Sequence, residues 1–126
     1  MSTKTTRILV AEDQDSLRQM VMVALQLDGH QVDTAENGQV ALERLSHHHY
    51  DLLLTDWRMP QLDGRSLILE TRQVEGGADL PVVVLSCLEG PDEDRPETLK
   101  IDRWLRKPCR ISEIQQAVKD VLRREH

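Results

Sequence analysis

Long hydrophobic runs, basic stretches and cysteines are scarce in this chain of 126 residues. Its apolar runs, such as residues 82–85, are too short for a transmembrane helix, and the polar stretch 1–6 lacks the apolar core of a signal peptide. With 22 acidic and 16 basic side chains, a net charge of −6 argues against direct nucleic-acid binding. Two cysteines, Cys87 and Cys109, cannot form a disulfide framework, so we expect them to pack as small apolar groups in a reducing compartment. The sequence therefore predicts one cytoplasmic domain, residues 1–126, with a core of about 7–122.

Short apolar runs alternate with stretches in which apolar residues recur every three or four positions. Three runs are continuously apolar: 8–11, 52–54 and 81–85. The run 31–35 alternates, as in a less buried strand, and the run 103–106 is a weak strand candidate. Helical spacing covers four stretches: 17–25, 40–45, 62–74 (with Gly76 and Gly77 ending it) and 111–122. Continuous apolar strands separated by helices are typical of a parallel sheet covered on both faces. We therefore expect an α/β domain of the (βα)5 type, a doubly wound five-stranded parallel sheet.

Polar side chains follow four of the five predicted strands. Glu12 and Asp13 follow the first strand, Asp56 the third, Ser86 the fourth and Lys107 the fifth. In such sheets the carboxyl ends of the strands line the ligand crevice. Three carboxylates at one edge repel each other unless one is protonated or a cation lies among them, and an oxygen cluster open to solvent favours Mg²⁺. A hydroxyl and an ammonium suit phosphoryl oxygens, and a carboxylate can itself be the nucleophile that forms an aspartyl-phosphate.

Five segments in this order resemble the receiver domain of bacterial two-component response regulators: 12–13, 52–56, 59–64, 82–86 and 107–108. The resemblance covers residues 7 to 122 and implies a flavodoxin-like fold and Mg²⁺ as cofactor. It also implies a signalling domain rather than an enzyme, phosphorylated by a sensor histidine kinase or a phosphotransfer protein. The output partner is not visible in the sequence, and homodimerisation is left open.

The resemblance assigns the phosphoacceptor role to Asp56. It implies that Mg²⁺ is held by four groups: Glu12, Asp13, Asp56 and the backbone carbonyl of Arg58. Ser86 and Lys107 would bind phosphoryl oxygens, and Trp104 would be the aromatic residue of a conformational switch.

Four further expectations come from the same resemblance. Arg58 and Leu88, two positions past the acceptor and past the hydroxyl, would tune the lifetime of the phosphoryl group. The peptide bond between Lys107 and Pro108 is expected to be cis, and Gly64 to lie in a loop that needs a free backbone conformation.

The segment between Ser86 and Trp104 departs from the family, in which a fourth helix normally lies there. Pro91 and Pro96 are five positions apart, so both cannot lie in the first turn of one helix. We therefore expect this segment to form a loop, or at most one or two turns starting near Pro96. We also expect it to be the most mobile part of the domain.

Other interpretations of these residues remain open. A phosphatase-type enzyme with an aspartate nucleophile would need a second acid two residues later, where Arg58 stands. A degenerate, phosphorylation-independent interaction module is disfavoured by the complete set of acids, hydroxyl and lysine. Trp104 could be a packing residue at the sheet edge, and the histidines at 47–49 indicate a solvated helix end rather than a metal site.

Overall fold

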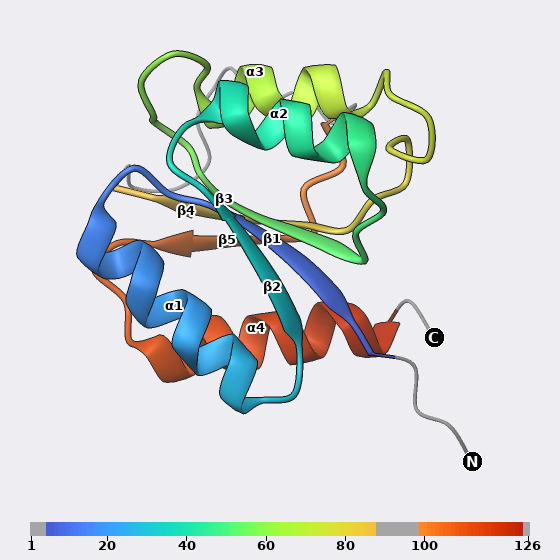
Figure 1. Ribbon diagram of the computed structural model, residues 1–126. Helices are drawn as coiled ribbons and strands as arrows, with labels where there is room; N and C mark the ends of the chain where they lie inside the picture. The colour runs from blue at the N-terminus through green and yellow to red at the C-terminus, as the bar shows by residue number, and fades with distance from the viewer. Residues whose placement is uncertain (1–4, 88–98, 125–126) are drawn as a thin grey trace.

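The computed structural model describes residues 5–87 and 99–124 as one parallel sheet covered by helices (Figure 1). In chain order the elements are β1 (Arg7–Ala11), α1 (Asp15–Leu27), β2 (Gln31–Ala35), α2 (Gly38–His47), β3 (Leu52–Asp56), α3 (Gly64–Thr71), β4 (Val82–Ser86), β5 (Arg103–Arg106) and α4 (Ile111–Arg124). The expected fourth helix or loop, and Leu88 with it, lie outside the described residues. Among the helices of the described part, none is long and apolar enough to cross a bilayer.

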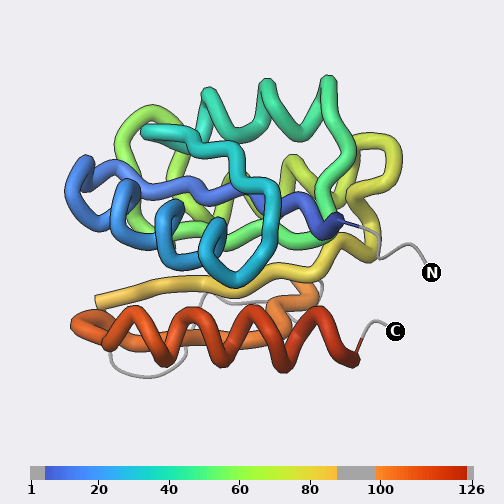
Figure 2. The backbone as a smooth tube through the Cα atoms, turned by 60° about the horizontal axis from the view of Figure 1, so that its bottom comes forward, coloured from blue at the N-terminus to red at the C-terminus, as the bar shows by residue number. Residues whose placement is uncertain are grey.

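The five strands are ordered β2-β1-β3-β4-β5, and every neighbouring pair is parallel. Helices α2 and α3 pack together on one face of the sheet, and α1 and α4 pack together on the other (Figures 1 and 2). This arrangement confirms the predicted doubly wound α/β fold.

Each face of the sheet carries its own hydrophobic core. Leu9 and Leu53 belong to the cluster under α2 and α3, whereas Ile8, Leu52 and Leu54 belong to the cluster under α1 and α4. Successive side chains of a strand point to opposite faces, so a strand buried on both sides must be continuously apolar. This requirement explains the unbroken apolar runs in the sequence.

Helix α3 is shorter than its apolar spacing predicts. It ends at Thr71, and the amides of Gln73 and Val74 bond to carbonyls only three residues back. Beyond that point the Arg72 guanidinium donates hydrogen bonds to the carbonyls of Gly77, Leu80, Leu99 and Lys100. The predicted extension to Val74 was therefore wrong, because the chain turns here around the Arg72 side chain.

Candidate phosphoacceptor and metal site

The polar residues predicted to act together meet at the carboxyl ends of the strands, on the left of Figure 1. Ala11 is paired with Thr55, Asp56 with Leu85, and Ser86 with Arg106. This register brings the residues at the ends of β1, β3, β4 and β5 to one edge, although they are up to 95 positions apart in the chain.

Three carboxylates form a compact cluster at this edge. One oxygen from each of Glu12, Asp13 and Asp56 lies within 4.8 Å of the others. Glu12 and Asp56 are buried, whereas Asp13 is exposed, so one side of the cluster is open to solvent. Hard oxygen donors with an open side suit a divalent cation that keeps several of its waters, so these residues fit Mg²⁺.

The Lys107 ammonium lies between two of these carboxylates. Its Nζ donates a hydrogen bond of 2.9 Å to Glu12 Oε1 and one of 3.0 Å to Asp56 Oδ2. A cation therefore lies among the carboxylates, which is one of the two expected ways of relieving their repulsion. Removing this cation would leave two buried carboxylates uncompensated.

Burial and hydrogen bonding act in opposite directions on this ion pair. Burial raises the pKa of Glu12, as does the nearby Asp56 charge, and together they outweigh the hydrogen bonds from Lys107 and the Gln14 amide. Burial alone would lower the pKa of Lys107, but its hydrogen bonds to Glu12 and Asp56 outweigh burial and raise that pKa. Lys107 therefore remains an ammonium at neutral pH.

Backbone and side-chain contacts fix Glu12 in place. The Gln14 amide donates to Glu12 Oε2 at 3.1 Å, and the Arg18 guanidinium donates to the Glu12 carbonyl at 3.0 Å. The amide of Glu12 continues the β1–β2 ladder by donating to the Ala35 carbonyl at 3.0 Å. Gln14 and Arg18 were not among the sequence candidates, because neither residue type at that spacing has a distinctive signal.

Gly64 supports Asp56 for a steric reason. Its amide donates to the Trp57 carbonyl at 2.8 Å, and a Cβ at this position would overlap the carbonyl oxygen of Asp56. Gly64 is the first residue of α3 and is not among the glycines with positive φ. The expectation of a loop residue with a free backbone conformation was therefore wrong: close approach of α3 to β3 excludes a side chain here.

Ser86 and Trp104 lie on β4 and β5, the two strands that follow β3 across the sheet. Ser86 is the buried last residue of β4, and its carbonyl accepts a 2.7 Å hydrogen bond from the Lys107 amide. Trp104 on β5 is half-buried, and its ring contacts that of Trp57, the residue after Asp56. No pattern in the sequence predicts this ring contact. The peptide bond between Lys107 and Pro108 is cis, as expected.

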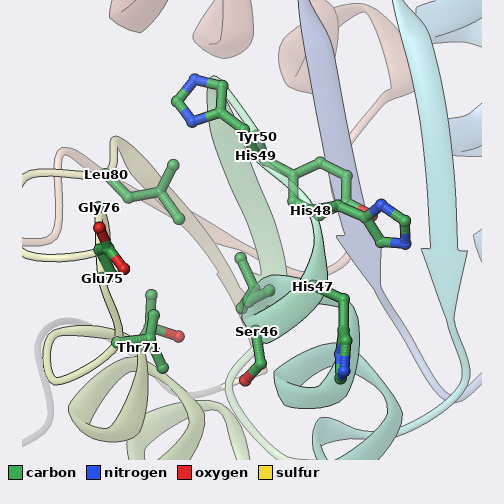
Figure 3. Close-up of a pocket in the computed structure, with 12 residues that line it drawn as sticks. Ser46, His47, His48, His49, Tyr50, Thr71, Glu75, Gly76 and Leu80 are labelled. Atoms are coloured by element: carbon green, nitrogen blue, oxygen red, sulfur yellow. The ribbon is translucent and has the colours of Figure 1, made fainter.

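The histidines at 47–49 lie at the opposite edge of the sheet, before β3. All three are exposed, and they line a cavity of about 210 Å³ together with Tyr50, Glu75 and Leu80 (Figure 3). Figure 3 shows the three imidazole rings pointing in different directions. The exposure of all three side chains at the end of α2 agrees with the predicted solvated helix end.

Of the remaining candidates, Arg58 is exposed beside the acceptor strand. Cys109 is half-buried and packs against the core under α1 and α4, as expected. Cys87 is exposed, so the expectation that it packs as an apolar group was wrong. The reason is its position one residue past the end of β4, where the sheet no longer covers it.

Comparison with known proteins places these features in a family. The sequence model for the response regulator receiver domain matches residues 8–119. The virulence transcriptional regulatory protein PhoP of Salmonella typhimurium is 38% identical over 120 residues, which are 94% of this chain and 52% of PhoP. The chain therefore spans about half the length of the curated relatives it matches.

Solved structures agree with this match. The chemotaxis response regulator CheY4 of Vibrio cholerae has a TM-score of 0.87 at 25% identity, covering 94% of this chain and 99% of CheY4. The response regulator TrrA of Thermotoga maritima, in complex with Mg²⁺ and BeF, has a TM-score of 0.81 at 29% identity. The match covers 93% of this chain and 99% of TrrA.

The chain belongs to the response regulator receiver domain family. It is a receiver domain of the CheY-like, flavodoxin-like fold, and its pocket of Glu12, Asp13 and Asp56 fits a phosphoacceptor aspartate with Mg²⁺. Receiver domains are phosphorylated by histidine kinases or phosphotransfer proteins and generally signal rather than catalyse.

Proposed function

We propose that residues 1–126 form a single cytoplasmic receiver domain that accepts a phosphoryl group on Asp56 from a sensor histidine kinase or a phosphotransfer protein. The observation that carries this proposal is the contact between Asp56 Oδ2 and the Lys107 ammonium, at 3.0 Å, inside a cluster of three carboxylates. An aspartate carboxylate held in this way can act as the nucleophile that accepts a phosphoryl group.

In the transfer step, a carboxylate oxygen of Asp56 attacks the phosphorus of a phosphohistidine. The new O–P bond forms as the P–N bond breaks, and the imidazole nitrogen of the donor leaves with the bonding electron pair. Four groups would hold Mg²⁺: the carboxylates of Glu12, Asp13 and Asp56 and the backbone carbonyl of Arg58. When bound, Mg²⁺ offsets the negative charge that the carboxylates present to the incoming phosphoryl group.

Lys107 and Ser86 then bind the transferred group. Lys107 holds an Asp56 oxygen before transfer, so the same ammonium is placed to pair with a phosphoryl oxygen afterwards. Ser86 ends the strand paired with β3, and its hydroxyl would donate to another phosphoryl oxygen. Movement at the end of β4 would then reach Trp104 on β5 and report phosphorylation to a partner.

The protein is proposed to act as a switch rather than an enzyme. Arg58, at the position where an aspartate-nucleophile phosphatase needs an acid, cannot protonate a leaving group. A phosphorylation-independent interaction module would not require Lys107 to be held between Glu12 and Asp56. Arg58 and Leu88 would limit the access of water to the phosphorus. The output partner is not identified, homodimerisation is left open, and the domain is not proposed to bind nucleic acid directly.

The test is phosphorylation by a small donor. The protein is incubated with Mg²⁺ and acetyl phosphate and its intact mass is measured. We expect the mass of one added phosphoryl group, lost when the metal is chelated and absent in Asp56→Asn. Asp63→Asn makes the same chemical change at an exposed helix cap and should leave labelling intact. Equal labelling of Asp56→Asn and the wild type would overturn the proposal.

A further inference from the structure

Two thiols line one cavity beside the proposed phosphoryl-binding residues. The cavity, of about 340 Å³, is lined by residues from the start of α1, the ends of β4 and β5, and α4. Cys87, Cys109 and Lys107 all line it, and apolar walls are supplied by Leu17 and Ile114. The two sulfurs are not joined by a disulfide in the structure.

The strand register and the cavity lining bring the two cysteines to the same edge of the sheet. Ser86 is paired with Arg106, and the Lys107 amide bonds to the Ser86 carbonyl at 2.7 Å, so Cys87 comes next to Lys107. Leu85 and Cys87 both line the cavity, and Cys109 lines it too while packing against the core under α1 and α4. Cys109 lies only two residues past Lys107, so both thiols reach the same cavity from adjoining segments of the chain.

The two thiols differ in access to solvent. Cys87 is exposed, whereas Cys109 is half-buried. Burial raises the pKa of Cys109, and the Glu113 charge adds to this effect, although the Lys107 charge opposes it. Oxidants react with accessible thiolates, so Cys87 should react first and Cys109 second.

We propose that Cys87 and Cys109 form a redox-sensitive site that peroxide converts to an intramolecular disulfide. In the first step the Cys87 sulfur displaces hydroxide from hydrogen peroxide, which yields a sulfenic acid and one water. In the second step the Cys109 sulfur attacks the Cys87 sulfur, the S–S bond forms, and the sulfenic hydroxyl leaves as a second water. Peroxide is reduced to water by the two electrons that the thiols lose, and a thiol reductant reverses the reaction.

The disulfide would join the residue after Ser86 to the residue two past Lys107. These are the two groups proposed to bind the phosphoryl oxygens, and the crosslink would restrict their movement. We therefore expect oxidised protein to be phosphorylated at least about fivefold more slowly than reduced protein, the lower end of usual coupling between two sites.

Disulfide formation is tested independently of phosphorylation. The reduced full chain is treated with hydrogen peroxide, remaining thiols are alkylated under denaturing conditions, and the intact mass is read. We expect the loss of two hydrogens, no alkylation, and full reversal by dithiothreitol. Cys109→Ser should stop at a sulfenic acid that dimedone traps, and Cys87→Ser should keep its remaining thiol alkylatable.

Three outcomes would overturn the proposal. These are two alkylatable thiols after treatment, crosslinking only between chains, or oxidation of Cys87 beyond sulfenic acid without a disulfide. Equal labelling of disulfide-bonded and reduced protein by acetyl phosphate would overturn the regulatory role. If neither form is labelled, the function proposed for Asp56 fails instead, and the mass of the unlabelled protein still decides whether the disulfide forms.

Discussion

The indole rings of Trp57 and Trp104 are in contact, with their centroids 4.9 Å apart and their planes inclined at 57°. Trp57 follows Asp56 at the end of β3 and is only 4% exposed, whereas Trp104 lies on the edge strand β5. Since β4 separates these strands, the two rings meet across it. The contact connects the residue next to the proposed acceptor directly with the proposed switch aromatic.

Mg²⁺ should change the fluorescence of Trp57. Metal binding to the adjacent Asp56 carboxylate alters the charge near this buried indole, so titration should give a saturable change in intrinsic emission. The change should persist in Trp104→Phe, in which Trp57 is the remaining tryptophan, and weaken sharply in Asp13→Ala. A flat titration of Trp104→Phe would contradict a metal site beside Trp57.

Gly64→Ala should destabilise the domain by about 2–3 kcal/mol, the usual cost of forcing extra atoms into a packed site. The new Cβ would overlap the backbone at Asp56 and Trp57, which cannot move aside as a flexible side chain can. Urea unfolding measures the loss. Ser16→Ala on the exposed side of α1 serves as the control and should stay within about 0.5 kcal/mol of the wild type. Equal stability of the two variants would show that α3 can retreat from β3 at little cost.

Lys107→Ala should tighten Mg²⁺ binding while it lowers phosphorylation. The Lys107 ammonium lies 2.9 and 3.0 Å from two oxygens of the acidic cluster and opposes a second cation there. Its removal should increase Mg²⁺ affinity about tenfold, or about 1.4 kcal/mol, in calorimetry at mildly alkaline pH. Lys100→Ala, at an exposed lysine paired with Asp79, should change neither property. Weaker Mg²⁺ binding by Lys107→Ala would mean that the ammonium organises the ligands rather than competing with the ion.

Arg58→Asn and Leu88→Ala should each shorten the lifetime of the phosphorylated protein. Arg58 is exposed beside the acceptor strand, and its long side chain would hinder water from reaching the phosphorus. Decay of the phosphorylated mass after removal of the donor gives the rate directly. If both variants decay at the wild-type rate, access of water is controlled by other residues.

Asp33→Asn should destabilise the protein at neutral pH by about 1–2 kcal/mol, since it weakens charge-assisted hydrogen bonds. Asp33 Oδ2 accepts a 2.6 Å hydrogen bond from Tyr50 and a 2.9 Å one from Arg7. Although burial opposes it, these bonds lower the pKa of Asp33 below its usual value. The native state thus favours ionised Asp33. The stability that this charge contributes is complete above the pKa of Asp33 in the unfolded state, and it is lost as pH falls through the pKa of Asp33 in the native state.

The difference in unfolding free energy between wild type and Asp33→Asn should therefore shrink in acid. Asp79→Asn provides a control, because Asp79 is 90% exposed in its pair with Lys100 and should contribute less than about 0.5 kcal/mol. A wild-type advantage that stays constant down to pH 2 would mean that the Asp33 charge is not responsible.

The sequence by itself determined the fold and most of the edge at which the site forms. Strands buried on both faces have to be continuously apolar, so the runs at 8–11, 52–54 and 81–85 specified the doubly wound sheet. Parallel strands place their carboxyl ends at one edge, so Glu12 and Asp56 could be assigned to it without a structure. These inferences need only the periodicity of a strand and the direction of the chain.

Only the tertiary structure decided the contacts between elements distant in the chain. Lys107 lies between Glu12 and Asp56 because the register of five strands and the turn after β5 together set where its flexible side chain ends. Trp57 and Trp104 meet across the strand that separates them, and Gly64 is required because α3 approaches the backbone of β3. Such contacts depend on the packing of whole elements and on side-chain rotamers, which a local sequence pattern does not encode.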